Sequence, residues 1–319
     1  MRKAALPLLF SREVKAIHCV GIAGMGVGPL AIYLAQLGFA VSGEDDAMTE
    51  AMGVQLTREK IVLTSAGSLP SDCDLVVCSS AISTKHPAFV AAAARKLPLV
   101  RRGELLAEVV RDKKLVAICG SHGKTTTTAM LITALRRANF PAGYVLGGLF
   151  NDEVLAPSRA GSNEWLVAEV DESDGTIDRF APEITVAVNL DWDHPDYYRQ
   201  LEDLETTFLA LLMRTRRAVL ISDACALSTR IAGQAEREWH ARPPESRPVI
   251  LTFGRAGDFR SQMDQDGDGR LTLALNGRFA IARATVRAQG EFNASNATAA
   301  LAAAQLMGVE LTPDRKSVV

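Results

Sequence analysis

The segment of this sequence that is best suited to chemistry is a glycine-rich loop with a single lysine. It reads Gly120-Ser-His-Gly-Lys124-Thr-Thr126, follows an apolar run and opens a helical stretch. Backbone N–H groups at a helix N-terminus attract an anion, the lysine adds a positive charge, and the first threonine hydroxyl can ligate Mg²⁺. The standard spacing would put a glycine where this chain has Ile118, so the loop is a shorter variant. The pattern predicts a phosphate-binding loop rather than a plain tight turn.

Carboxylates follow the next two apolar runs. Glu169 and the acidic segment 171–174 end one run, and His194 stands among aspartates after the next. Because neighbouring parallel strands end at one crevice, these side chains are expected to lie near the phosphate loop. Carboxylate oxygens suit Mg²⁺, although a solvated acidic loop is the alternative. His194 could be a metal ligand, a general base or an exposed histidine held by Asp193.

A second glycine-rich segment contains Gly21, Gly24 and Gly26 and also stands between a predicted strand and a predicted helix. Its order differs from G-x-G-x-x-G, which disfavours a nicotinamide cofactor, but a diphosphate could still bind at the helix N-terminus. Two such loops suggest two phosphorylated ligands. The segment 264–269 is similar to the start of an EF-hand, but Leu275 stands where a glutamate is needed, so we predict a hairpin turn there.

Strand-like and helical segments alternate along the chain, which is typical of an α/β protein with parallel sheets covered on both faces. A charged tract at 111–114 precedes a new strand, and we place a domain boundary there, giving residues 1–112 and 113–319. The predicted strands are 16–20, 39–42, 75–78, 115–119, 165–170, 184–189, 218–222 and 249–253, and the predicted helices are 29–37, 88–96, 125–138 and 294–307.

Composition narrows the class of protein. With 35 Lys plus Arg against 37 Asp plus Glu, the net charge of −2 provides no basic surface for a nucleic acid. A hydrophobic content of 48% argues against disorder, and no apolar run is long enough to span a bilayer. Five dispersed cysteines, an odd number, indicate reduced thiols and a cytoplasmic protein without membrane insertion.

Together these motifs resemble those of the Mur ligases, the ATP-dependent amide-forming enzymes of peptidoglycan precursor synthesis. The resemblance implies an N-terminal Rossmann-like parallel-sheet domain that binds a UDP-sugar, residues 1–112, and a P-loop-type central ATPase domain, residues 113–319. It also implies a third, carboxyl-terminal domain, which we expect to be missing because the sequence stops near the end of the second. The matching stretches are IHCVGIAGMGVGPLA, CSSAI, RRGELLAEVV, AICGSHGKTTTTAMLITAL, YVLGGLFN, WLVAEVDESDGT, VAVNLDWDHPDYY and GEFNASNATAALAAA.

The resemblance also implies roles for single residues. Lys124 would contact the γ-phosphate, Thr125 and Glu169 would bind Mg²⁺, and His194 would bind a second Mg²⁺. His122 would border the acyl-phosphate site, so Lys124 and His122 are the catalytic candidates. The implied ATP-binding residues are Gly120, Ser121, His122, Gly123, Lys124, Thr125, Thr126, Asn293 and Asn296. The implied UDP-sugar-binding residues are Gly21, Gly24, Gly26, Ser79 and Ser80.

The sequence departs from the family pattern at Phe292, where a histidine is usual before the two asparagines. The reaction it implies uses ATP and Mg²⁺ to activate the lactyl carboxylate of UDP-N-acetylmuramate and joins it to L-alanine. Three alternatives stay open: a nucleotide- and UDP-sugar-binding module without turnover, a cell-wall recycling ligase that adds a tripeptide, and a dinucleotide oxidoreductase. The last leaves the Lys124 loop unexplained, and the oligomeric state is not indicated by the sequence.

Overall fold

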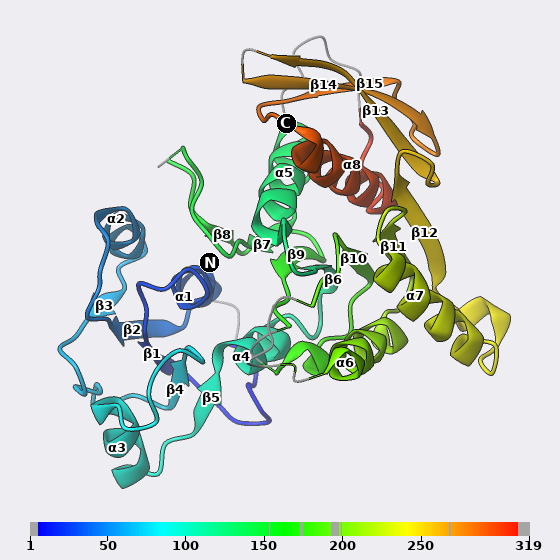
Figure 1. Ribbon diagram of the computed structural model, residues 1–319. Coiled ribbons are helices and arrows are strands. Elements are labelled where there is room, and N and C mark those ends of the chain that lie inside the picture. Colours follow the sequence, from blue (N-terminus) through cyan, green and yellow to red (C-terminus); the bar gives the residue numbers. More distant parts are fainter. Residues whose placement is uncertain are drawn as a thin grey trace. The chain divides into compact units, whose positions relative to one another are not determined.

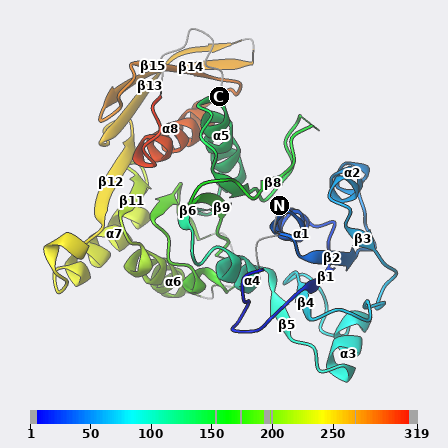
Figure 2. The same cartoon turned by 180° about the vertical axis from the view of Figure 1, so that it is seen from behind.

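A computed structural model describes residues 6–152, 154–172, 175–192, 198, 200–267 and 269–311 (Figures 1 and 2). The chain forms two compact units. The first contains residues 1–112 and 143–162, and the second contains residues 113–142 and 163–319. The segment 143–162 therefore packs with the first unit although it lies beyond the charged tract at 111–114.

The first unit is built on a five-stranded parallel sheet in the order β3-β2-β1-β4-β5. The central strands β1 and β4 are buried along their whole length, as expected for a sheet covered on both faces. The strands are β1 Ala16–Val20, β2 Ala40–Glu44, β3 Val62–Leu63, β4 Leu75–Cys78 and β5 Leu99–Arg101, and the helices are α1 Val27–Leu37, α2 Glu50–Arg58, α3 Pro87–Ala94 and α4 Arg102–Val109.

A short hairpin of β7 Gly143–Val145 and β8 Ser158–Arg159 completes this unit. The hydroxyl of Ser158 donates to the backbone oxygen of Pro29 at 2.6 Å, and the backbone N–H of Ala160 donates to Gln36 Oε1 at 2.9 Å. These contacts attach the hairpin to α1. Residues 143–162 thus belong to the same unit as the first glycine-rich segment.

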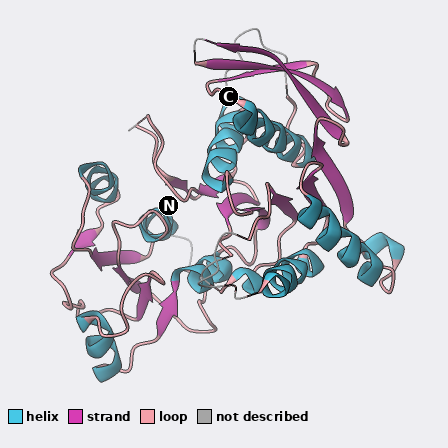
Figure 3. Cartoon of the chain, in the orientation of Figure 1, coloured by secondary structure: helices cyan, strands magenta, loops and turns pink. Residues whose placement is uncertain are grey.

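The second unit contains a mixed sheet in which β12-β11-β10-β6-β9 run parallel (Figure 3). β13 pairs parallel with β12, and an antiparallel arm of β14 and β15 follows it. The strands are β6 Lys114–Cys119, β9 Trp165–Glu169, β10 Ile184–Ala187, β11 Ala218–Ser222, β12 Val249–Gly254, β13 Phe259–Gly267, β14 Arg270–Gly277 and β15 Arg283–Val286, and the helices are α5 Lys124–Arg137, α6 Leu201–Arg214, α7 Ala226–Trp239 and α8 Glu291–Leu306. Two short 3₁₀ helices cover Ile177–Arg179 and Pro244–Ser246.

Helix α8 lies beside α5, and both views show the two helices together (Figures 1 and 2). A hydrogen bond of 2.6 Å between the hydroxyls of Ser261 and Thr298 joins α8 to β13. Near the start of α8, Asn296 packs on Gly123, which precedes α5, although the two residues are separated by more than half of the chain.

The predicted α/β class is confirmed, and strands 75–78 and 218–222 have the predicted bounds. The predicted hairpin is confirmed, but its turn is shorter than 264–269, because β13 continues to Gly267 and β14 begins at Arg270. Asp264 lies at an irregularity in the register of that strand rather than in the turn. Helices α2, α4, α6 and α7 were not predicted. Among the helices that the structure describes, none combines the length and apolar character of a bilayer span.

Candidate nucleotide-binding site

The glycine-rich loop of the second unit lies where three parallel strands end. β6 has β10 on one side and β9 on the other, with Cys119 in register with Ala187 and Ile118 in register with Glu169. The residues that follow β6 therefore meet the ends of both neighbours. This is the crevice at the carboxyl ends of strands where α/β proteins bind ligands, as predicted from the order of the motifs.

The backbone of this loop is held by hydrogen bonds to Asn189, which follows β10. Ser121 N donates to Asn189 O at 3.0 Å and His122 N donates to Asn189 Oδ1 at 2.8 Å. Gly120 has φ +128°, and a Cβ atom there would lie 2.4 Å from Asn189 O. A side chain at position 120 is therefore incompatible with this loop. No role was predicted for Asn189, although its place at the end of a predicted strand was a usable signal.

Lys124 is held by the protein at the start of α5. Its Nζ donates to Gly120 O at 2.6 Å and lies 3.1 Å from each carboxylate oxygen of Glu172. Glu172 is only 1% exposed. Burial raises the pKa of the Glu172 carboxyl, while the Lys124 ammonium opposes that shift. The sequence analysis noted Glu172 only as one of several acidic residues and missed this ion pair.

Thr125 and Glu169 supply a pair of oxygens next to the lysine. Thr125 Oγ1 donates to Glu169 Oε2 at 3.0 Å, with the threonine exposed and the glutamate buried. Two adjacent ligands of an octahedral ion at about 2.1 Å stand about 3 Å apart, so this separation fits Mg²⁺. The described residues contain no group of three or more His, Cys, Asp or Glu placed to hold a metal by themselves.

The remaining loop residues differ in exposure. The Ser121 hydroxyl donates to Asp191 O and accepts from Asp191 N, each at 2.8 Å. The side chain of His122 is exposed and that of Thr126 is half-buried. His194, the predicted second metal ligand, lies outside the described residues.

Of the two asparagines of α8, Asn296 packs against the loop. Asn296 is buried, and a Cβ atom on Gly123 would lie 2.6 Å from its Oδ1. Gly123 has φ +80° and precedes the first residue of α5, so the asparagine packs on the loop backbone. Asn293 donates to Gln289 O at 2.8 Å. The structure thus brings Asn296 to the loop, while Asn293 contacts Gln289 and Asn296 within α8.

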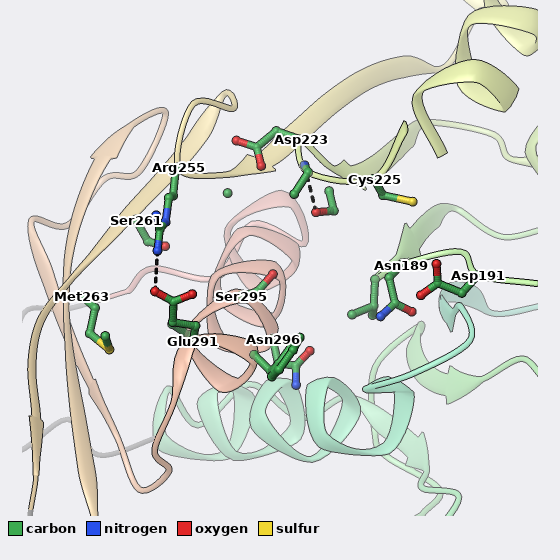
Figure 4. A pocket seen from close by; sticks show the side chains of 16 residues that line it. Asn189, Asp191, Asp223, Cys225, Arg255, Ser261, Met263, Glu291, Ser295 and Asn296 are labelled. Carbon is green, nitrogen blue, oxygen red and sulfur yellow. Dashed lines mark hydrogen bonds and ion pairs between the residues drawn. The ribbon is translucent and has the colours of Figure 1, made fainter. Parts of the chain in front are cut away.

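A cavity of about 540 Å³ opens beside the loop and shares Asn189 and Asn296 with it (Figure 4). Phe292, in the first turn of α8, lines it with its side chain 88% exposed. Most of the lining was not predicted from the sequence, including Asp223, which directly follows β11 and accepts from Ala256 N at 2.6 Å. The other labelled residues in Figure 4 are Asp191, Cys225, Arg255, Ser261, Met263, Glu291 and Ser295.

The first unit gathers part of the predicted UDP-sugar set. β1 and β4 are neighbours, so the residues after Val20 and after Cys78 meet. A Cβ atom on Gly21 would lie 3.7 Å from Ser79 Cβ. Ser79 is half-buried and Ser80 is exposed. Gly24 and Gly26 lie in the turn that leads into α1, where Arg102 Nε donates to Gly26 O at 3.3 Å.

Strand, glycine loop, lysine and helix, with a carboxylate at the end of the neighbouring strand, form the arrangement typical of α/β proteins of the phosphate-loop class. Two family models match the chain: the Mur ligase family catalytic domain over residues 16–114 and the Mur ligase middle domain over residues 118–304. The chain belongs to the Mur ligase family.

Its relatives include UDP-N-acetylmuramate–L-alanine ligases of Rhodopseudomonas palustris strain BisA53, 33% identical over 96% of this chain, and of Bartonella tribocorum, 31% identical over 93%. The chain spans 66% of the first relative's length and 63% of the second's. The fold is similar to the UDP-N-acetylmuramate–alanine ligase of Thermotoga maritima, with TM-score 0.79, 24% identity and coverage of 94% of this chain and 67% of that one.

A second structural neighbour is the UDP-N-acetylmuramate:L-alanyl-γ-D-glutamyl-meso-diaminopimelate ligase of Neisseria meningitides, with TM-score 0.77 and 25% identity. The alignment covers 93% of this chain and 95% of that one. Both neighbours therefore share the two-unit architecture described above.

Proposed function

We propose that this chain is the acceptor- and nucleotide-binding part of an ATP-dependent ligase of peptidoglycan precursor synthesis. The reaction activates the lactyl carboxylate of UDP-N-acetylmuramate as an acyl phosphate and joins it to the amino group of L-alanine, with release of ADP and phosphate. Support comes from family membership and from relatives with 31–33% identity that carry this name.

The observation that carries the proposal is the arrangement of Lys124, Thr125 and Glu169 at the N-terminus of α5. Phosphoryl transfer needs little covalent help from the protein and depends on positioning and on neutralising negative charge. The ammonium of Lys124 and the helix N-terminus supply positive potential where the phosphates would lie. His122 would border the reacting carboxylate, and Asn293 and Asn296 would contact the adenine side of ATP.

Thr125 and Glu169 are the residues that would hold Mg²⁺, and their separation of 3.0 Å fits it. When bound, the ion would offset charge on phosphate oxygens. His194 remains the proposed ligand of a second ion. In the first unit, the turn with Gly21, Gly24 and Gly26 and the residues Ser79 and Ser80 form the proposed UDP-sugar site.

We further propose two domains along the chain, residues 1–112 and 113–319, with the segment 143–162 packed in the first unit. We also propose a cytoplasmic location, where ATP is abundant. All five cysteines are free thiols in the structure, which is compatible with a reducing compartment. No nucleic-acid partner is proposed, because the net charge is −2.

The experiment is amino-acid-dependent phosphate release with UDP-N-acetylmuramate and MgATP. It compares this chain with a chain extended to the length of its relatives, and L-alanine with the tripeptide that the Neisseria ligase adds. We expect release with L-alanine from the extended chain and binding without turnover from this one. Release with the tripeptide alone would favour the recycling ligase, and release with neither would contradict ligase activity.

A further inference from the structure

The ammonium of Lys124 is bound by protein atoms on two sides. Nζ donates to Gly120 O at 2.6 Å and to the Glu172 carboxylate, both of whose oxygens lie at 3.1 Å. The lysine side chain is 16% exposed and the glutamate 1%. A phosphate oxygen that approaches this lysine must therefore compete with a contact that already exists.

Glu172 is fixed in place by contacts on both sides. Its carboxylate meets Lys124, and its backbone oxygen accepts a hydrogen bond of 2.6 Å from the Tyr198 hydroxyl. A buried carboxylate is costly without a cation beside it. Lys124 is the cation that the structure gives it, so the charge of Glu172 depends on where this lysine lies.

Few other ionisable groups face the Glu172 carboxyl within the described part of the chain. Asp171, its neighbour in the chain, disfavours the charged form, and Lys124 from α5 favours it. The thiol of Cys119 at the end of β6 is buried, and burial raises its pKa, so that it stays neutral. Without Lys124, only the backbone N–H of Glu172 itself would favour a negative charge on its carboxyl.

We propose that Glu172 is a displaceable partner of the phosphate-loop lysine: nucleotide phosphates compete with this carboxylate for Lys124, and the released carboxyl takes a proton from solvent. Glu172 is thus a positioning residue that holds Lys124 when no nucleotide is bound. This inference rests on the proposed nucleotide-binding function. It adds that binding of a nucleotide is coupled to proton uptake, so affinity rises as pH falls.

The test is calorimetric titration of MgATP and of inorganic tripolyphosphate into this chain at pH 7.5, in two buffers of different ionisation enthalpy. The terminal phosphate of ATP, with a pKa of about 6, is almost fully ionised there, so the proton balance is taken from the MgATP titration and the tripolyphosphate titration measures affinity only. We expect the native chain to take up protons on binding. Absence of uptake, or net release, would overturn the proposal without any variant being needed.

Glu172→Gln removes the competing charge while keeping the shape of the side chain. We expect its affinity for tripolyphosphate to increase by about tenfold, because the phosphate no longer displaces a charge-assisted contact, and its proton uptake to fall. Glu238→Gln, the same substitution at an exposed position of α7, is the matched control and should behave like the native chain. Unchanged uptake or weaker binding in Glu172→Gln, with a native melting temperature, would contradict the inference.

A third variant separates this inference from the proposed function. Lys124→Ala should lose tripolyphosphate binding. If it binds as well as the native chain, the phosphate-loop assignment fails and this inference fails with it. If it loses binding while Glu172→Gln matches the native chain in affinity and proton uptake, only the role of Glu172 is refuted.

Discussion

The two glycine-rich loops of this chain share a local plan. β1 ends at Val20 and α1 begins at Val27, and β6 ends at Cys119 and α5 begins at Lys124. Each loop therefore leaves the carboxyl end of a parallel strand and leads into a helix N-terminus, where backbone N–H groups can face an anion. The two loops differ in the side chains that surround them.

In the first loop, backbone atoms do most of the bonding. Gly21 N and Ile22 N donate to Glu44 O at 3.0 and 3.2 Å, and Ala23 N donates to Asp45 Oδ2 at 2.8 Å. Residues 21–28 contain no lysine or arginine. In the second loop, Lys124 and Thr125 meet the buried carboxylates Glu172 and Glu169. We expect the first loop to hold a phosphate that does not react and the second to hold the phosphate that is transferred.

Substitution of Lys124 should have the largest effect. In the full-length context, Lys124→Ala should lose at least about 10²-fold in turnover, because a charge contact to the transferred phosphate is removed. From the sequence alone, an exposed loop lysine would leave stability unchanged. The contact with Glu172 changes that expectation, because removing one partner of a buried ion pair costs about 3 to 5 kcal/mol.

Thermal unfolding of Lys124→Ala and of the double variant Lys124→Ala with Glu172→Gln measures this cost. The double variant should recover much of the lost stability while staying inactive, because the buried charge is gone. Equal melting temperatures for the native chain and Lys124→Ala would show that the pair does not stabilise the fold.

Two glycine substitutions, one in each loop, test whether the two loops differ in backbone geometry. Gly120→Ala should destabilise the second unit by about 4 kcal/mol, because φ is +128° and the new Cβ would lie 2.4 Å from a backbone oxygen. Gly26→Ala should cost less than about 1 kcal/mol, because φ is −88° and the nearest atom is Arg102 Nε at 3.4 Å. Denaturant unfolding measures both, and similar costs would contradict the difference in loop geometry.

These examples show what the sequence could predict. The order of strand, loop and helix, and the meeting of Glu169 with Thr125, followed from apolar runs and from the rule that parallel strands end at one edge. The contacts of Lys124 with Glu172 and of Gly120 with Asn189 could not be predicted. An acidic tract, for example, does not show which of its carboxylates is buried. The amphipathic helices α6 and α7 were also missed, and with them the cavity residues around Asp223.

Acid should destabilise the first unit, around β1, more than it destabilises the second unit. His18 is fully buried, its Nδ1 lies 2.9 Å from Ser42 Oγ, and its Nε2 has no hydrogen-bond partner among the described residues. Burial lowers the pKa of His18 from 6.5 to about 4. Because the unfolded chain binds this proton more readily, stability present above pH 6.5 is lost as pH falls toward 4, by about 2 to 3 kcal/mol.

Hydrogen exchange of β1 and β6 amides between pH 6.5 and 4, corrected for intrinsic rates, measures this difference. β1 should lose protection, and His18→Gln should reduce that loss because glutamine cannot take the charge. A pH response in β1 that is identical in His18→Gln and the native chain would show that His18 is not its source.

The smallest expected effect concerns Phe292, which lines the cavity beside the second loop with its ring exposed. Stacking of a base on an aromatic side chain contributes about 1 to 3 kcal/mol, so Phe292→Ala should weaken MgATP binding by about tenfold. Tripolyphosphate, which has no base, should bind the variant and the native chain equally. Phe292→His should restore part of the affinity, and equal weakening of both ligands would place the base elsewhere.

The most direct test of the account is a pair of calorimetric titrations of Glu169→Gln with MgATP and with UDP-N-acetylmuramate. The amide can still accept the hydrogen bond from Thr125 Oγ1 but is a poor ligand for Mg²⁺. We predict that MgATP binding is lost, or requires much more Mg²⁺, while the UDP-sugar binds with native affinity at the first loop. Native affinity for both ligands, or equal loss of both in a folded variant, would contradict the assignment of the two loops to two different phosphorylated ligands.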